Sequence, residues 1–160
     1  MRWACVVLLV MLAGCKAGGD YKPAERPEAD SGETDGRMFD FVTNKPDGED
    51  WQIRIRGSSL WAAYSEGDAT EDLGSKNLTE KEAKRVWKLI DALDIPERDE
   101  GTKDEDEGFV VLRLRVPGGE DGHDIYTTHM SRGTDDEDLI ELAEYLQDLI
   151  AKYHKETPNF

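Results

Sequence analysis

Cysteine, basic residues and long apolar runs are all scarce in this chain of 160 residues. No cysteine follows Cys15, so the rest of the chain forms no disulfide and must be stabilised by a packed core. Lysine and arginine number 20 against 36 acidic residues, and the net charge of −16 argues against nucleic acid as a partner. After residue 14 no run approaches the about twenty apolar residues that a membrane-spanning helix needs.

Signatures of catalysis and of cofactor binding are missing as well. The sequence has no Gly-x-Ser-x-Gly elbow and no glycine-rich phosphate loop that leads into a helix. His123 and His129 fall on one face of one predicted strand, but about 20 Å of strand separates them, too far to share a metal ion. The acidic segments 68–79 and 104–108 miss the glycine spacing of a calcium-binding EF-hand loop. We therefore expect no enzyme, no cofactor and no metal site.

The first fifteen residues have the pattern of a secretory signal. A single cation, Arg2, precedes an apolar run from Trp3 to Leu12, and the run ends in Ala13, Gly14 and Cys15. This order is typical of the charged, apolar and cleavage regions of a signal peptide. The run is too short to cross the roughly 30 Å of bilayer hydrocarbon, so we predict a cleaved signal rather than a membrane helix.

The end of this segment resembles the lipobox of bacterial lipoproteins. Leu12 matches its aliphatic position, Ala13 and Gly14 its pair of small residues, and Cys15 its invariant cysteine. The resemblance implies that residues 1–14 are removed and that Cys15 carries the lipid that anchors the protein to a membrane. Lys16, where an aspartate retains many lipoproteins in the inner membrane, implies the periplasmic face of the outer membrane if the cell is Gram-negative. The alternative is an ordinary signal peptide with a chance cysteine.

Two regions follow the predicted cleavage site. Residues 15–36 consist of the lipidated cysteine and a segment rich in glycine, proline, alanine and acidic residues, which cannot bury enough apolar area to fold. We interpret it as a flexible acidic tether. Residues 37–160 contain the alternating and helical apolar patterns and are predicted to form a single domain.

Those patterns predict an α+β domain. Apolar and polar residues alternate in five segments, which indicates strands near residues 38–43, 51–56, 60–64, 109–116 and 123–130. A capping box at Thr79 and Glu82 predicts a helix over residues 80–93, with Trp87 on its apolar stripe. A second box at Thr134 and Glu137 predicts the start of the last helix. We expect an antiparallel sheet of about five strands with two helices on one face.

The two halves of this domain share an order of elements. Ile-Arg-Ile-Arg at 53–56 and Leu-Arg-Leu-Arg at 112–115 each precede a turn, a second strand and a capped helix. This similarity raises the hypothesis of an internal ββα duplication. In layout alone, the order resembles small secreted domains, including uncharacterised lipoproteins and β-lactamase-inhibitor-like folds, and a layout does not select a function.

Four arginines in this acidic chain are the candidate binding residues: Arg54, Arg56, Arg113 and Arg115. Strand alternation places all four on the face away from the helices, where they would form one stripe if their strands were neighbours. Such a stripe suits a carboxylate or another anion, on peptidoglycan or on an envelope protein. The alternative is cross-strand pairing with Asp40, Glu66 or Asp124. The sequence thus predicts a membrane-anchored, non-catalytic binding or scaffolding domain of the cell envelope; alternatives are an inhibitor of an exported hydrolase or, third, an enzyme.

Overall fold

The computed structural model describes residues 35–46, 48–118 and 122–160. The predicted signal peptide, Cys15 and nearly all of the predicted tether lie outside these described residues. No helix within them is long and apolar enough to cross a membrane.

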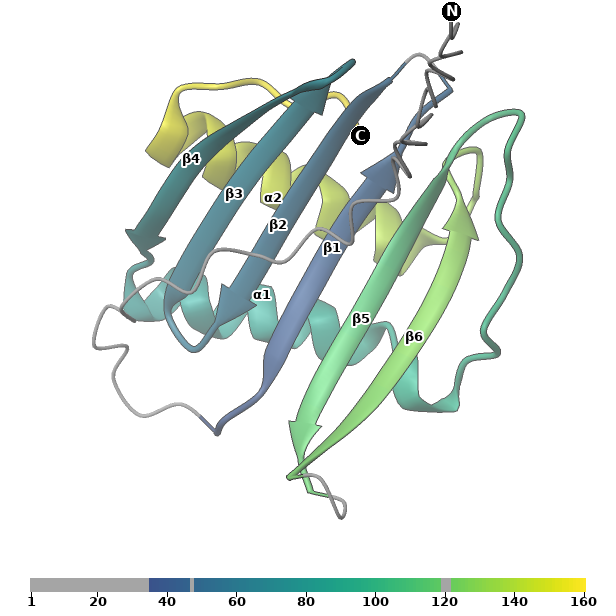
Figure 1. Ribbon diagram of the computed structural model, residues 1–160. Coiled ribbons are helices and arrows are strands. Elements are labelled where there is room, and N and C mark those ends of the chain that lie inside the picture. The colour runs from purple at the N-terminus through teal and green to yellow at the C-terminus, as the bar shows by residue number, and fades with distance from the viewer. Residues whose placement is uncertain (1–34, 47, 119–121) are drawn as a thin grey trace, which may run out of the picture.

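Six strands form one antiparallel sheet in the order β4-β3-β2-β1-β5-β6 (Figure 1). The strands are β1 Met38–Asn44, β2 Glu49–Arg56, β3 Ser59–Glu66, β4 Ala69–Asn77, β5 Phe109–Pro117 and β6 His123–Ser131. The helices are α1 Glu80–Ala92, the short 3-10 turn η1 Ile95–Glu97, and α2 Glu137–His154. The first strand of the domain therefore lies inside the sheet, between β2 and β5.

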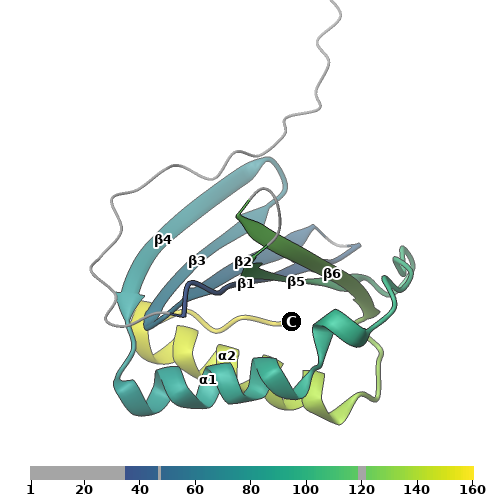
Figure 2. The ribbon, with the colours of Figure 1, turned by 90° about the horizontal axis from the view of Figure 1, so that it is seen from below.

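Both long helices cover the same face of the sheet (Figure 2). The expected α+β architecture, an antiparallel sheet with two helices on one face, is therefore confirmed. The core lies between these two layers, because alternate strand residues such as Phe39, Phe41, Ile53 and Leu112 point to the helices and are at most 1% exposed. The stripe of α2 that includes Leu142 and Leu146 meets them.

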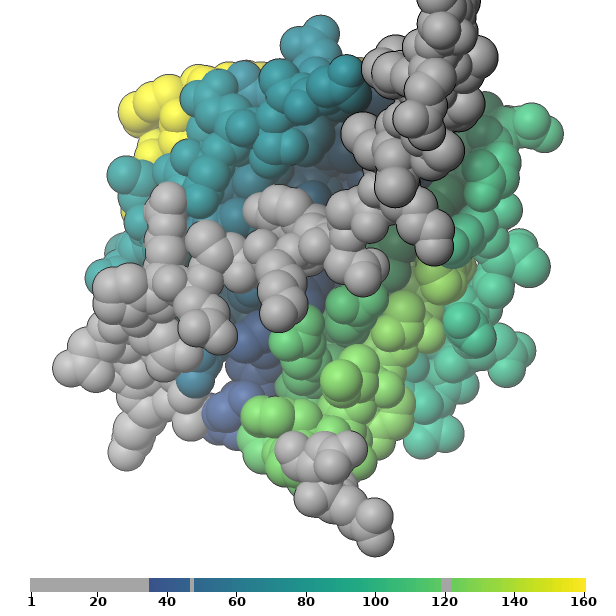
Figure 3. Space-filling model, viewed as in Figure 1, coloured from purple at the N-terminus to yellow at the C-terminus, as the bar shows by residue number. Residues whose placement is uncertain are grey.

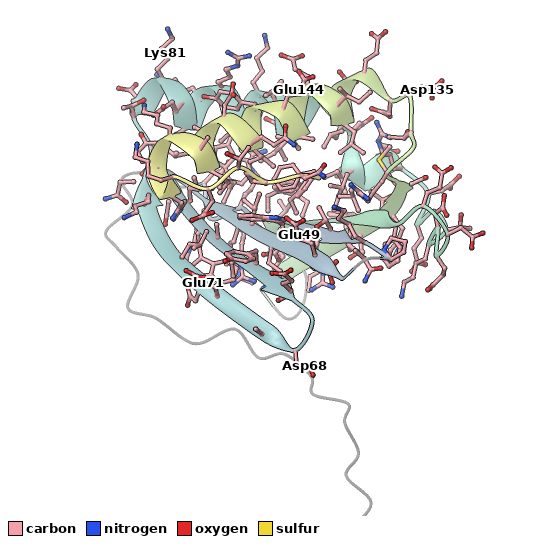
Figure 4. All side chains as sticks on the ribbon, turned by 90° about the horizontal axis from the view of Figure 1, so that it is seen from above. Glu49, Asp68, Glu71, Lys81, Asp135 and Glu144 are labelled. Atoms are coloured by element: carbon pink, nitrogen blue, oxygen red, sulfur yellow. The ribbon has the colours of Figure 1, made fainter. Side chains whose placement is uncertain are left out.

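The C-terminal tail closes one end of this core. Phe160 packs its ring 5.0 Å from that of Phe41 and 6.3 Å from that of Trp51. Gln147 of α2 donates a hydrogen bond of 3.2 Å to the carbonyl of Pro158 and so holds the tail against the helix. Figure 4 shows Glu144 of the same helix on the side away from the sheet, where it is exposed.

Strand β4 is the element that sequence patterns did not predict. None of its nine residues is buried, and its register against β3 shifts at a bulge between Ala62 and Ala63. Leu73 is its one large apolar residue and packs only partly against the core, so β4 shows no alternation of apolar and polar residues. The sequence of residues 68–79 was compared only with a calcium loop. In the structure, Gly67 and Asp68 form the turn that joins β3 to β4, with Asp68 at its tip (Figure 4), and residues 69–77 form β4 itself.

The helix starts agree with prediction at α1 only. Thr79 caps α1, and its side chain and that of Glu82 form the expected box. The cap of α2 is Asp136, whose carboxylate accepts from the backbone N–H of Leu139 at 2.9 Å, and not Thr134. Thr134 Oγ1 instead accepts from the N–H of Asp136 at 3.2 Å, which orders the turn before the helix.

The strand order argues against two superimposable ββα repeats. β2 and β5 are both antiparallel to β1 and therefore run in the same direction. However, β3 lies to one side of β2 and β6 lies to the opposite side of β5, while both helices cover the same face. The two hairpins are thus mirror images in layout, and no rotation brings one onto the other. The proposed duplication is limited to a shared residue pattern.

Candidate outer-face site

The face of the sheet opposite the helices, here called the outer face, holds all four predicted arginines. Its residues at one end of the sheet are Met38, Asp40, Arg54, Arg56, Trp61, Arg113, Arg115, Ile125 and Thr127. Figure 3 views this face and shows atoms of β1, β5 and β6 at the surface in its lower half. The outward direction of the arginines is as predicted, because each alternates with a buried residue of the same strand.

The four guanidiniums do not form one uninterrupted stripe. Arg54 and Arg113 are each in register with Asp40, and Arg56 and Arg115 are each in register with Met38. Strand β1 therefore separates the two pairs, so the condition for a single stripe, that β2 and β5 be neighbours, is not met. The separation follows from the position of β1 in the sheet, which the order of segments in the sequence does not reveal.

Asp40 binds one arginine from each side. Arg54 Nε lies 2.6 Å from Asp40 Oδ1, and Arg115 Nη2 lies 3.2 Å from Asp40 Oδ2. The Asp40 side chain is only 10% exposed, so the two guanidiniums supply the charge and the hydrogen bonds that a carboxylate loses when it leaves water. This contact confirms the alternative interpretation for Arg54 and Arg115, with Asp40 as their partner rather than Glu66 or Asp124.

Arg54 is held from a second direction by Trp61. Its guanidinium carbon lies 5.8 Å from the centre of the Trp61 ring, within the range of a cation–π contact. The Trp61 indole N–H in turn donates to the carboxylate of Asp72 on β4, at 3.1 Å. Arg54 is consequently a structural residue of this face, and Arg56 also has an interaction partner.

Arg113 has a different environment. It is exposed, and no carboxylate among the described residues forms an ion pair with it. Beside it, Nε of Arg115 is buried without a hydrogen-bond partner in the described structure. A planar guanidinium with its donors free is suited to bind a carboxylate or phosphate through two parallel hydrogen bonds. Of these two arginines of β5, Arg113 is the one whose guanidinium is exposed and has no carboxylate partner among the described residues.

The two larger hollows recorded among the described residues lie away from these arginines. One, of about 770 Å³, is lined by the loop after η1 and by β6 residues that include His129 and Ser131. The other, of about 860 Å³, lies beside α1 and includes Trp87 and Arg37. Trp87, expected in the core, is only half-buried: it donates to the carbonyl of Gly57 at 2.9 Å and stacks under the Arg37 guanidinium.

Within the described residues, no group of three or more histidine, cysteine, aspartate or glutamate side chains is arranged to hold a metal ion. His129 Nδ1 lies 3.1 Å from the carbonyl oxygen of Glu100, within hydrogen-bond distance of the loop after η1. The pKa of His154, at the end of α2, is lowered by burial and by the charge of Lys76, against the effect of its backbone bond to Leu73. The neutral ring is therefore favoured there.

Among the predicted site residues, Arg54, Arg56, Arg113 and Arg115 share the outer face, whereas Cys15 lies outside the described residues. In the sequence, Asp40 was only one of three possible pairing partners, and Trp61 and Ile125 were not singled out. Alternation along β3 and β6 is the signal that could have placed these two residues on the outer face. A scan against protein-family models and a search of curated proteins find no match to this chain.

Proposed function

We propose that this chain is a lipid-anchored, non-catalytic binding domain of the bacterial cell envelope, and that its outer face binds a carboxylate-bearing partner. The observation that carries the proposal is the contrast between Arg54, which is bound to Asp40, and Arg113, which is exposed on the same face and has no carboxylate partner in the described part of the chain. An exposed guanidinium can bind a carboxylate through two parallel hydrogen bonds, with defined geometry.

The anchor is proposed from the lipobox resemblance alone. Acylation requires the Cys15 thiol, so cells given an alkyne-bearing fatty acid should label the wild-type chain and leave a Cys15→Ser variant unlabelled. Absence of label on the wild-type chain would remove the lipoprotein proposal and leave an ordinary exported protein.

Binding is tested with two carboxylate probes, a glutamate-containing peptide and a soluble peptidoglycan stem peptide. Arg113→Lys keeps the charge but loses the planar fork, so we expect at least about tenfold weaker binding of the probe that the domain recognises. Arg85→Lys is the matched control, because Arg85 is exposed on α1, in the helix layer. Equal affinity of wild type and Arg113→Lys for every probe that binds would contradict the proposal.

A further inference from the structure

Strand β6 forms one edge of the sheet, and only half of that edge is covered. The loop after η1 runs beside β6 (Figure 1). There the N–H of His129 donates to the carbonyl of Glu100 at 2.7 Å, and Thr128 Oγ1 donates to the carbonyl of Asp99 at 2.8 Å. Towards the start of β6, no hydrogen bond from the described loop reaches residues 123–127.

The backbone of this uncovered half is oriented to receive another strand. In an antiparallel pair, alternate residues direct both N–H and C=O to the partner or away from it. His129 directs its N–H away from β5, to the loop, so Thr127 and Ile125 also direct theirs outward. These outward groups form a row to which an extended segment can add.

The side chains along the same row favour a partner of particular chemistry. Ile125 is 60% exposed, the most exposed large apolar side chain among the described residues. It is in register with Arg115, and Thr127 is in register with Arg113, so all four lie on the outer face. Neighbouring strands are about 4.8 Å apart, so a strand added to β6 would lie about 9.6 Å from β5, a distance that an arginine and a glutamate side chain span together.

The opposite edge of the sheet lacks these features. β4 contains the bulge opposite Ala62 and Ala63, and Glu71 and Asp72 lie along it. Bulges and charged side chains are the usual means by which an edge strand avoids pairing with another chain. The two edges therefore differ: the β6 edge has an unbroken register with β5, the exposed Ile125, and the exposed Arg113 on the adjoining strand.

We propose that the partner binds as a seventh strand: an extended, glutamate- or aspartate-containing protein segment adds to β6 at residues 123–127. Its backbone pairs with Ile125 and Thr127, and a carboxylate on its outer face reaches the exposed Arg113. The proposal rests on the function proposed above and specifies the class of partner and its mode of binding.

The test uses the full chain and a fluorescein-labelled octapeptide in which glutamate alternates with valine and threonine, with binding followed by anisotropy. Ile125→Pro removes an outward N–H and leaves the bonds to β5 in place, as an edge position allows. We expect at least about tenfold weaker binding of the peptide. The matched control is Ser75→Pro on β4. Just past the end of β4, the N–H of Leu78 donates to the carbonyl of Ser58, the residue before β3, so alternation turns the Ser75 N–H away from β3. It should bind like wild type.

A second measurement keeps the test valid if Ile125→Pro fails to fold. The same peptide N-methylated at alternate amides cannot pair as a strand, and it should bind the wild-type chain at least about tenfold more weakly. If it binds equally well, or if Ile125→Pro binds as wild type while Arg113→Lys does not, strand addition is wrong and the function proposed above stands. If neither variant changes binding, both proposals fail. A wild-type dimer in sedimentation that Ile125→Pro dissociates, with no peptide binding, would make a second copy the occupant and overturn this inference.

Discussion

The two faces of the sheet are built from the same strands, yet they have different roles. On the inner face Phe39, Ile55 and Leu112 are fully buried against the helices. On the outer face the residues beside them in sequence are Asp40, Arg54 and Arg113, of which two form an ion pair and one is exposed. Apolar burial on the inner face can therefore stabilise this domain while single residues on the outer face remain available for recognition.

Asp40 is the exception to that division. It lies on the outer face, but its side chain is about as inaccessible as parts of the core, and it fixes Arg54 and Arg115. A buried charge with two partners costs little as long as all three are present, and much when one is lost. The outer face therefore contains one residue on which stability depends.

Truncation of the inner face should have the largest effect. Leu142 and Leu146 of α2 are fully buried, so replacing either by alanine should lower the free energy of unfolding by about 2–5 kcal/mol. Denaturant unfolding measures the loss. Glu144→Ala on the same helix points away from the sheet and should cost under about 0.5 kcal/mol. Equal losses at Leu142 and Glu144 would contradict this assignment, because α2 would then not pack against the sheet through the side that contains Leu142.

Asp40→Asn should have the next largest effect on the unfolding free energy, and it measures how much the outer face contributes to stability. Asparagine keeps the shape but removes the charge that holds two guanidiniums, and we expect a loss of about 2 kcal/mol in unfolding free energy. This is less than for a fully buried pair, since Arg54 and Arg115 are 26% and 30% exposed. An unchanged melting temperature would show that the outer face contributes nothing to stability even at Asp40.

Glu82 joins the two helices that cover the inner face. Its pKa is lowered to about 2, first by the bond from Lys152 at 2.6 Å and then by the cap residue Thr79, with Tyr153 also donating. A lowered folded-state pKa means that this stabilisation is complete above about pH 4.5 and is lost as pH falls towards 2. Glu82→Gln should therefore cost about 1 kcal/mol at pH 7 and almost nothing at pH 2, as measured by denaturant unfolding at both values. A difference that grows on acidification would contradict the assignment.

Arg113→Lys should have the smallest effect on stability. Because Arg113 is exposed and has no carboxylate partner among the described residues, its replacement should change the unfolding free energy by under about 0.5 kcal/mol. The thermal melt of this variant should overlay that of wild type, even though binding is expected to weaken. A loss comparable to that of Asp40→Asn would place Arg113 among the structural residues and remove it from the proposed site.

Periodicity predicted most of this fold, for a physical reason. Phe39 and Phe41, Ile53 and Ile55, and the leucines of α2 must reach one apolar layer, and burial on one side imposes a period that the sequence displays. β4 contributes little to the core and shows no such period. Phe160 was missed because a single aromatic residue at the end of a polar tail has no pattern, although it packs on Phe41.

The sequence predicted which face of the sheet the four arginines occupy, but not how they are arranged on that face. Alternation fixed which side the arginines face, since Arg54 and Arg113 each follow a buried aliphatic residue. It could not say which strands are neighbours, because pairing between distant segments leaves no local signal. β1 lies between the two pairs, and its Asp40 binds one arginine of each, Arg54 and Arg115. Arg56 has an interaction partner too, which leaves Arg113 without one among the described residues.

The inner position of β1 also affects how the chain folds. Met38 pairs with Arg56 on one side, through a nearby hairpin, and with Arg115 on the other, after most of the domain intervenes. Closing that long loop is slow compared with forming the hairpin. Until β5 pairs, β1 is therefore an edge strand of the sheet formed by the first half of the domain. In that interval the unpaired edge of β1, which contains Phe39 and Phe41, can pair with strands of other chains. Synthesis that stops before β5 would leave the middle of the sheet as its most aggregation-prone border.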